Sequence, residues 1–354
     1  MNAKKLFALL LAVAMVLSVF AGCNSVTDIV VDPANANFVA WDGALYSTGY
    51  EELLFYPRMK DGDLSKLHPN TKKIGNKVFQ GNPKITEVHI GKNIVAIGDG
   101  AFESCLELKK VTFDSNIAEM TIGTSAFAKC VLLTTIELPK CTTVVSAYAF
   151  EASGLTSFTI PENAIELGVG ALSATHITTI HIPANLEIIR DGAFYNCEKL
   201  TSITFAPGTK ALSLGTLTNE GYGVFQNTQI ATLVMGDRVT VIGANAFRLV
   251  KTLKSLTMGP DCQVTDIGNG AFYGNAKLKT LTLGPRVREI GANAFNGATL
   301  RNKLVIPNSV EVIRDSAFRN TALSSVYFEP GGTEPLHIKG NSVFVGGQIK
   351  EITF

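Results

Sequence analysis

The sequence has few charged residues and no cluster of basic ones. Only 17% of its 354 residues are charged, 46% are hydrophobic, and the formal net charge is +1. This composition predicts a buried core and excludes an intrinsically disordered chain. Because no run of Lys and Arg follows one face, nucleic acid is excluded as a partner.

Recognisable catalytic and metal-binding motifs are also absent. None of the five histidines stands with Ser or Cys and a carboxylate at the spacing of a catalytic triad. The 32 glycines recur with the turns and form no phosphate-binding loop. We therefore predict no catalytic residue, no metal site and no cofactor, and hence a protein that is not an enzyme.

The N-terminal hydrophobic run is too short for a membrane anchor. It extends from Leu6 to Phe20 behind Lys4 and Lys5, short of the roughly 20 residues that cross a bilayer. Residues 1–22 therefore have the pattern of a secretory signal peptide. The following Phe-Ala-Gly-Cys resembles the bacterial lipobox, with Phe in place of the usual Leu. The resemblance implies a lipid on Cys23 and anchoring at the extracellular face of the bacterial membrane; the alternative is an ordinary secreted protein.

Two short segments precede the main part of the chain. Residues 23–36 are polar and turn-prone and predict a tether. In residues 37–73, the turn-forming pairs Asp42-Gly43 and Thr48-Gly49 separate short apolar runs, which predicts β-hairpins. The aromatic residues of this segment are interpreted as a cap over the first coil of a repeat array, with a ligand platform as the alternative; they are Trp41, Tyr46, Tyr50, Phe55 and Tyr56.

An internal repeat occupies residues 74–354. Each unit contains a marker residue, preceded by Ala or Val, and most markers lie 22 to 25 residues apart. The interval from Phe194 to Phe225 is longer, at 31 residues. The markers are Phe79, Phe102, Phe127, Phe150, Leu172, Phe194, Phe225, Phe247, Phe272, Phe295, Phe318 and Phe344. A single unit cannot bury its own hydrophobic side, so the repeat predicts stacked coils with the markers in a continuous spine.

One unit shows how each coil is expected to fold. Alternation in residues 200–205 predicts a strand with Ile203 and Phe205 inward. A second apolar segment follows, and a glycine such as Gly291 is expected to permit a tight turn. The Ala-Phe pair is expected on a helical or 3₁₀ turn. Thr299 to Leu304 carries an extra residue, and Glu220 and Lys339 replace apolar ones, so local bulges or loops are expected in those coils.

The unit resembles the bacterial leucine-rich repeats of the BspA-like type, which follow the pattern IGxxAFxxCxxLxxIxIP. Residues 97–105, IGDGAFESC, and residues 290–295, IGANAF, match it well. The resemblance implies a strand-rich α/β-type repeat fold, a right-handed solenoid of about twelve coils with a parallel β-sheet on one face. It also implies adhesion to host matrix proteins or to other cells.

The cysteines do not form a complete disulfide framework, because five remain besides Cys23. Cys105 and Cys130 fill the same slot in adjacent coils, so a bridge between them is conceivable. Buried thiols are the favoured interpretation, since Ser, Thr and Asn fill that slot elsewhere.

The outward residues of the predicted strands are the candidate binding face. Most are Ser or Thr, and charged or aromatic side chains on this background are candidate contacts; they are Glu87, His89, Lys110, Glu137, His181 and Tyr327. At about 4.8 Å per coil, His89 and His181 lie roughly 19 Å apart, too far to share a metal ion.

Three functions are compatible with the sequence. The favoured one is a cell-surface module that binds a protein partner, either a host matrix protein or a bacterial surface protein. The second is capture of a glycan, which needs exposed aromatic planes near polar groups; Tyr327 and the N-terminal aromatic residues qualify. The third is structural self-association end to end, because Phe354 falls within a predicted last strand that no polar cap follows.

Overall fold

The computed structural model describes residues 26–60, 62–218 and 221–354. The predicted signal peptide and Cys23 lie outside these residues. The chain divides into two compact units. The smaller unit contains the described residues up to Thr142 together with Ala152–Leu155, and the larger contains Thr143–Glu151 and Thr156–Phe354. Both are strand-rich solenoid sections of stacked coils, as predicted.

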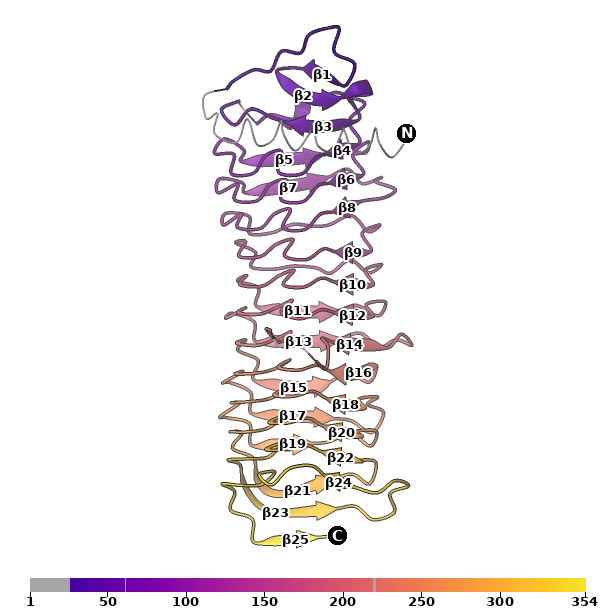
Figure 1. Ribbon diagram of the computed structural model, residues 1–354, viewed down its shortest axis with the longest axis vertical. Coiled ribbons are helices and arrows are strands. Elements are labelled where there is room, and N and C mark those ends of the chain that lie inside the picture. The colour runs from indigo at the N-terminus through magenta and orange to yellow at the C-terminus, as the bar shows by residue number, and fades with distance from the viewer. Residues whose placement is uncertain (1–25, 61, 219–220) are drawn as a thin grey trace. The chain divides into compact units, whose positions relative to one another are not determined.

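The smaller unit begins with antiparallel strands and continues with parallel ones (Figure 1). β1 (Phe38–Trp41), β2 (Ala44–Ser47) and β3 (Glu52–Phe55) are antiparallel, and Asp42 and Gly43 connect the first two. β3 then pairs in parallel with β4 (Lys73–Ile74), which is followed by β6 (Ala96–Ile97) and β8 (Thr121–Ile122). A second sheet pairs β5 (Glu87–Ile90) with β7 (Lys110–Phe113), and two 3₁₀ helices span Thr48–Tyr50 and Leu64–Lys66.

The larger unit has two columns of parallel strands. The column of short strands forms one nine-stranded sheet; it contains β9 (Val144–Val145), β10 (Glu166–Leu167), β12 (Ile188–Ile189), β14 (Leu212–Leu214), β16 (Val239–Ile242), β18 (Asp266–Ile267), β20 (Glu289–Ile290), β22 (Val312–Ile313) and β24 (His337–Ile338). The column of longer strands is the predicted outward face; it contains β11 (Thr179–Ile182), β13 (Ser202–Phe205), β15 (Thr232–Met235), β17 (Ser255–Met258), β19 (Thr280–Thr282), β21 (Arg301–Ile306), β23 (Ala322–Phe328) and β25 (Glu351–Thr353). The longer strands form three separate sheets.

The marker residues form the predicted spine within each unit. In the smaller unit, the ring centroids of Phe79 and Phe102 are 5.1 Å apart, and the rings are nearly parallel. In the larger unit, consecutive markers from Phe194 to Phe344 stack with centroids 5.0 to 5.5 Å apart. Eleven of the twelve markers are buried, and Phe344 is half-buried. Each ring covers the next, so the hydrophobic core is continuous through each unit.

The segment around each Ala-Phe pair is not the helical or 3₁₀ turn that was expected. It is a series of turns whose backbone groups bond to the adjacent coil: the amide of Phe295 donates to the carbonyl of Ala317 at 2.8 Å. Positive φ angles interrupt any helix, as at Asn293 with φ 56°. The adjacent coil therefore satisfies the backbone groups that a helix would pair internally.

The glycine that follows most of the short strands has a different role from the predicted one, as Gly291 shows. Gly291 has no positive φ. A Cβ on it would lie only 2.6 Å from the backbone nitrogen of Asn269 in the preceding coil. Glycine is required there because two backbones stack closely, not because the chain turns tightly.

Two of the three predicted irregularities can be compared with the described residues. The register of β21 with β23 shifts between Asn302 and Lys303, but the residue left out of the pairing is Ser324 on β23, so the extra residue near Thr299 does not form the expected bulge. The coil of Lys339 keeps its register, because the Lys339 amide still donates to the carbonyl of Ile313 at 2.8 Å. Glu220 lies outside the described residues.

Candidate binding surfaces

Three predicted contact residues meet on the sheet face of the smaller unit. Glu87 and His89 project from β5 and Lys110 from β7, all exposed, and Glu87 lies opposite Lys110 in the strand register. The imidazole of His89 contacts the Thr112 hydroxyl and the Asp114 carboxylate, each at 3.0 Å. Asp114 follows β7 directly, outside the alternating positions from which the contacts were predicted.

Glu137 is exposed in the same unit, but residues 135–138 do not form the predicted strand. Ile136 and Leu138 on either side of it are buried. The inward–outward alternation is therefore kept without a hydrogen-bonded ladder.

The remaining predicted contacts lie far apart in the larger unit. His181 is exposed on β11, and its ring contacts the Thr204 hydroxyl at 2.9 Å. Tyr327 on β23 is half-buried, and the Lys303 ammonium lies 4.0 Å from its ring centroid. Six coil steps separate these two strands, about 29 Å at the usual strand spacing. The two side chains therefore cannot contact one compact ligand.

The N-terminal aromatic residues contact one another. The ring of Trp41 meets that of His68 edge to face at 4.8 Å, and Tyr50 stacks on His68 at 3.9 Å. The Trp41 indole donates to the carbonyl of Lys66 at 3.0 Å. Tyr46 is fully buried, and burial raises the pKa of its phenol. These contacts order the cluster, and Trp41 remains 43% exposed.

The column of longer strands is interrupted twice, between β13 and β15 and between β19 and β21, and the first interruption borders a hollow. β11 pairs with β13, and β15 pairs with β17, but in the described part of the chain no ladder joins β13 to β15. Figure 1 shows these two strands further apart than their neighbours. The first interruption coincides with the 31-residue interval between Phe194 and Phe225. A longer interval is not needed for such an interruption, since β19 and β21 are also not paired with each other in the described chain, while Phe272, Phe295 and Phe318 keep intervals of 23 residues.

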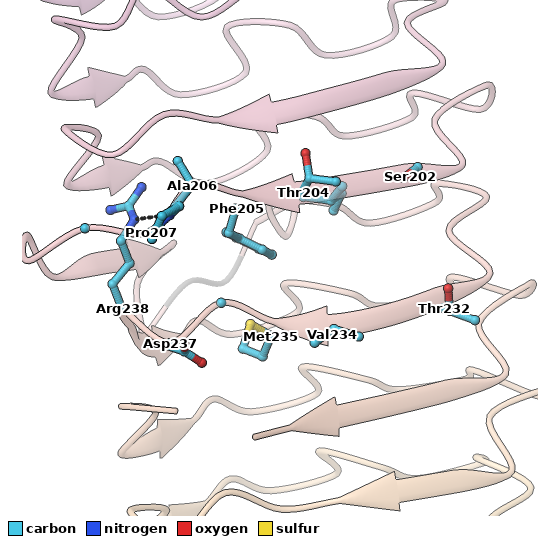
Figure 2. Close-up of a pocket in the computed structure, with 13 residues that line it drawn as sticks. Ser202, Thr204, Phe205, Ala206, Pro207, Thr232, Val234, Met235, Asp237 and Arg238 are labelled. Carbon is cyan, nitrogen blue, oxygen red and sulfur yellow. Dashed lines mark hydrogen bonds between the residues drawn. The ribbon is translucent and has the colours of Figure 1, made fainter. Parts of the chain in front are cut away.

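The first interruption opens a hollow of about 590 Å³, which we call the strand-break hollow. Figure 2 shows Phe205 and Met235 pointing into the space between the two strands. Ile203 and Phe205 are half-buried, whereas Ile180 and Ile182 in the same positions on β11 are buried. The hollow thus has an apolar floor beside the hydroxyls and carboxylate of its rim; the rim residues are Ser202, Thr204, Thr232, Val234 and Asp237.

One buried arginine lines the strand-break hollow and bonds to the backbone around it. Arg238 is 5% exposed, and its guanidinium donates to four backbone carbonyls, those of Pro183, Leu186, Ala206 and Lys210. Burial lowers its pKa. The bonds join the residues after β13 to the preceding coil, so this side chain replaces hydrogen bonds that a regular coil makes between backbones.

The cysteines of the described chain are free thiols, which confirms the favoured interpretation. The Cys105 thiol donates to the carbonyl of the marker Phe79 in the preceding coil at 3.0 Å, and Cys130 donates to Phe102 in the same way at 3.1 Å.

Within residues 26–60, 62–218 and 221–354, no three His, Cys, Asp or Glu side chains are grouped closely enough to hold a metal ion. Over the same ranges, the chain contains no helix of the length and hydrophobicity that a membrane span requires.

Comparison with known proteins identifies related repeats and related folds. Residues 120–220 and 218–350 match the profile of the BspA type leucine rich repeat region, in six copies. A leucine-rich repeat protein from Bacteroides ovatus ATCC 8483 is 22% identical, with a TM-score of 0.52 over 90% of this chain and 92% of that one. A leucine rich cell surface protein from Faecalibacterium prausnitzii A2-165 is also 22% identical, with a TM-score of 0.45 over 92% and 95%. No curated protein matches the sequence.

Proposed function

We propose a function from one premise: the chain belongs to the BspA-type leucine-rich repeat family. The proposed function is capture of a protein partner, a host matrix protein or a bacterial surface protein, without catalysis. The proposed location is the extracellular face of the bacterial membrane, with the chain anchored by a lipid on Cys23. A repeat solenoid is consistent with a binding module, since its stacked coils present an extended surface.

The rigidity of the scaffold supports this proposal. Inward side chains of the longer strands are buried, as Leu256 and Met258 are on β17, while the outward Thr257 is exposed. The stacked marker rings fix each coil against the next. Outward side chains therefore project from a preformed surface, and binding costs little ordering of the backbone.

The size of the strand face shows that a partner must contact more than the strands. The eight longer strands of the larger unit cover about 34 Å by about 13 Å, or about 440 Å². A stable interface buries about 800 Å² on each partner. The contact must therefore extend over adjacent loops or into a recess.

The strand-break hollow is the observation that carries the proposal. It adds the half-buried Ile203 and Phe205 to a face whose outward residues are mostly polar. Beside it, Val234 is 69% exposed on β15. Apolar side chains that enter a desolvated recess contribute most of the affinity at protein interfaces. A partner with an apolar side chain that fills this hollow gains area that the flat strand face lacks.

The test is capture of surface proteins followed by affinity measurements on variants. Residues 24–354 would be used to capture host or bacterial surface proteins, and the dissociation constant of the captured protein would be measured. Val234→Glu places a carboxylate at the hollow and is expected to weaken binding at least tenfold. Val305→Glu is the matched control, because Val305 is also outward, on β21, and 39% exposed. That change is expected to alter affinity less than threefold.

Two results would contradict the proposal. Equal losses from the two glutamate variants would show that the hollow has no special role. Binding that survives Val234→Glu but is lost when Glu87, His89 and Lys110 become alanine would move the site to the β5–β7 face. Light scattering of the free chain tests the rival structural role, which requires association that increases with concentration.

A further inference from the structure

A second hollow in the larger unit is lined by three tyrosines on the side of the marker turns. Tyr148 comes two residues before its marker, Tyr195 one residue after its marker, and Tyr222 three residues before its marker. Together they line a space of about 570 Å³, which we call the tyrosine hollow. Tyr148 is 39% exposed and Tyr222 is 57% exposed. Large exposed rings gathered around one recess are typical of binding sites.

Two of the tyrosines form a preassembled platform. The rings of Tyr195 and Tyr222 stack with centroids 3.8 Å apart and planes 14° apart. Gly192 lies beside both, and a Cβ on it would be 3.5 Å from the Tyr222 Cβ and 3.8 Å from the Tyr195 Cβ. Each ring restricts the other, so much of the entropy cost of ordering them is met before a ligand arrives.

The third tyrosine forms another wall of the hollow, across a coil of small residues. The Tyr148 ring lies on Gly170, where a Cβ would be only 2.5 Å from its Cε1. Gly170 and Ser173 belong to the coil between Tyr148 and Tyr195, and they leave the space open. The backbones that carry Tyr148 and Tyr195 are two coil steps apart, about 10 Å, and the hollow lies beside the Tyr148 ring, which covers Gly170.

The charged groups of the tyrosine hollow are all negative and accept hydrogen bonds. Glu151 and Asp191 contribute carboxylates, and no Lys, Arg or His is among the lining residues. One oxygen of Asp191 accepts from the Thr216 amide at 3.0 Å, and the other accepts from the Thr216 hydroxyl at 2.9 Å. The carboxylate is therefore held in one orientation with lone pairs left for a ligand.

We propose that the tyrosine hollow binds an oligosaccharide that has no acidic groups. A sugar ring presents a face of C–H groups that packs on an aromatic plane, and hydroxyls around its edge that donate to carboxylates. The carboxylates of Glu151 and Asp191 repel uronic acids, and they repel the phosphates of nucleotides for the same reason. This site is separate from the strand-break hollow and adds glycan binding to the proposed capture of a protein.

The first test compares neutral and acidic sugars on the full chain. Saturation-transfer difference NMR would be recorded with cellotetraose, mannotetraose and N-acetylchitotetraose, and with tetragalacturonate as the acidic probe. At least one neutral probe is expected to bind with a dissociation constant below about 1 mM, and tetragalacturonate at least tenfold more weakly. Failure of all three neutral probes to bind, or tighter binding of tetragalacturonate, overturns the proposal.

Variants then assign the binding to this hollow. Tyr222→Ala is expected to weaken it at least tenfold, and Tyr222→Phe, which keeps the ring, to change it less than threefold. Tyr273→Ala is the matched control, because Tyr273 directly follows the marker Phe272 as Tyr195 follows Phe194.

Glu151→Lys tests the role of charge. It is expected to reduce the difference in affinity between the neutral probes and tetragalacturonate. Equal effects of Tyr222→Ala and Tyr273→Ala overturn the assignment. Val234→Glu leaves sugar binding unchanged, so the two proposals fail or succeed separately.

Discussion

Arg238 illustrates how a single side chain can hold an irregular coil. Its guanidinium donates to four carbonyls while only 5% exposed. Arg238→Met would remove the donors to the buried carbonyls of Pro183 and Leu186, of which Pro183 keeps the Leu186 amide, and to the part-buried carbonyls of Ala206 and Lys210. The cost is about 1–3 kcal/mol for each group that is left without a donor where water cannot reach. We expect the free energy of unfolding in urea to fall by about 3 kcal/mol or more. Arg238→Lys should recover less than half of the loss, because an ammonium lacks the planar set of five donors.

Arg248→Met is the control for that measurement. The Arg248 guanidinium lies 4.6 Å from the centroid of the Tyr273 ring and is half-buried. Removal of such a contact costs about 0.5–1 kcal/mol. Similar losses for the two methionine variants would show that the four carbonyls find water when Arg238 is absent.

The cysteines should differ in reactivity, because four of the five are buried and one is half-buried. Burial raises the pKa of Cys105 to about 12 and that of Cys197 to about 11, and it also raises the pKa of Cys130 and Cys262. At pH 8 the reactive thiolate of Cys105 is then about one part in ten thousand. Cys141 is half-buried.

We therefore expect iodoacetamide at pH 8 to label Cys141 in the folded chain and to spare the four buried cysteines. Raising the pH to 9 should still spare Cys105 and Cys197, because pH 9 lies well below their pKa values of about 12 and about 11. Peptide mass spectrometry would locate the label, and unfolding in urea should make all five reactive. Fast labelling of Cys105 in the folded chain would contradict the burial seen in the structure.

At the scale of one coil, the glycine that follows most of the short strands controls how closely these coils stack. A Cβ on Gly268 would lie 2.5 Å from the backbone nitrogen of Ala244. Gly268→Ala is therefore expected to lower the free energy of unfolding by about 1–3 kcal/mol, because a backbone must move. At Gly259, by contrast, a Cβ would meet no atom within 4 Å, and φ is not positive. Gly259→Ala is expected to be neutral or stabilising by up to about 1 kcal/mol.

Urea unfolding of the two alanine variants distinguishes close stacking from a turn requirement. If glycine only permitted a turn, its φ would be positive, which it is not at Gly268. An equal effect of the two substitutions would mean that adjacent coils separate without cost. Such a result would also weaken the explanation for the regular spacing of these glycines.

The regular parts of each coil were predictable because they repeat. The register of markers such as Phe272 and the inward positions of strands such as β17 follow from the recurrence alone. The short strands were not predicted, because two residues such as Glu166 and Leu167 show too little alternation. Asp114 was missed because it lies just beyond its strand, where the repeat prescribes no outward position.

The two hollows depend on departures from the repeat, which a recurring pattern cannot place. The strand-break hollow results from the missing pairing of β13 with β15, and the sequence shows only the longer interval between markers. The tyrosine hollow combines residues at three different offsets from their markers. Their proximity depends on how neighbouring coils stack, and no single unit contains that information.

At the scale of the whole molecule, the proposed lipid on Cys23 decides where these surfaces are displayed. The residue lies outside the described residues, so the proposal rests on the leader and lipobox pattern of the sequence. Cys23→Ser is expected to abolish incorporation of a fatty-acid probe in cells and to release the chain from the membrane fraction. The physical reason is that each buried CH₂ contributes about 0.8 kcal/mol, so two or more acyl chains give stable anchoring. Cys141→Ser should keep both label and membrane retention. Label that persists in Cys23→Ser would contradict the lipid anchor, and loss of retention without loss of label would place the anchor elsewhere.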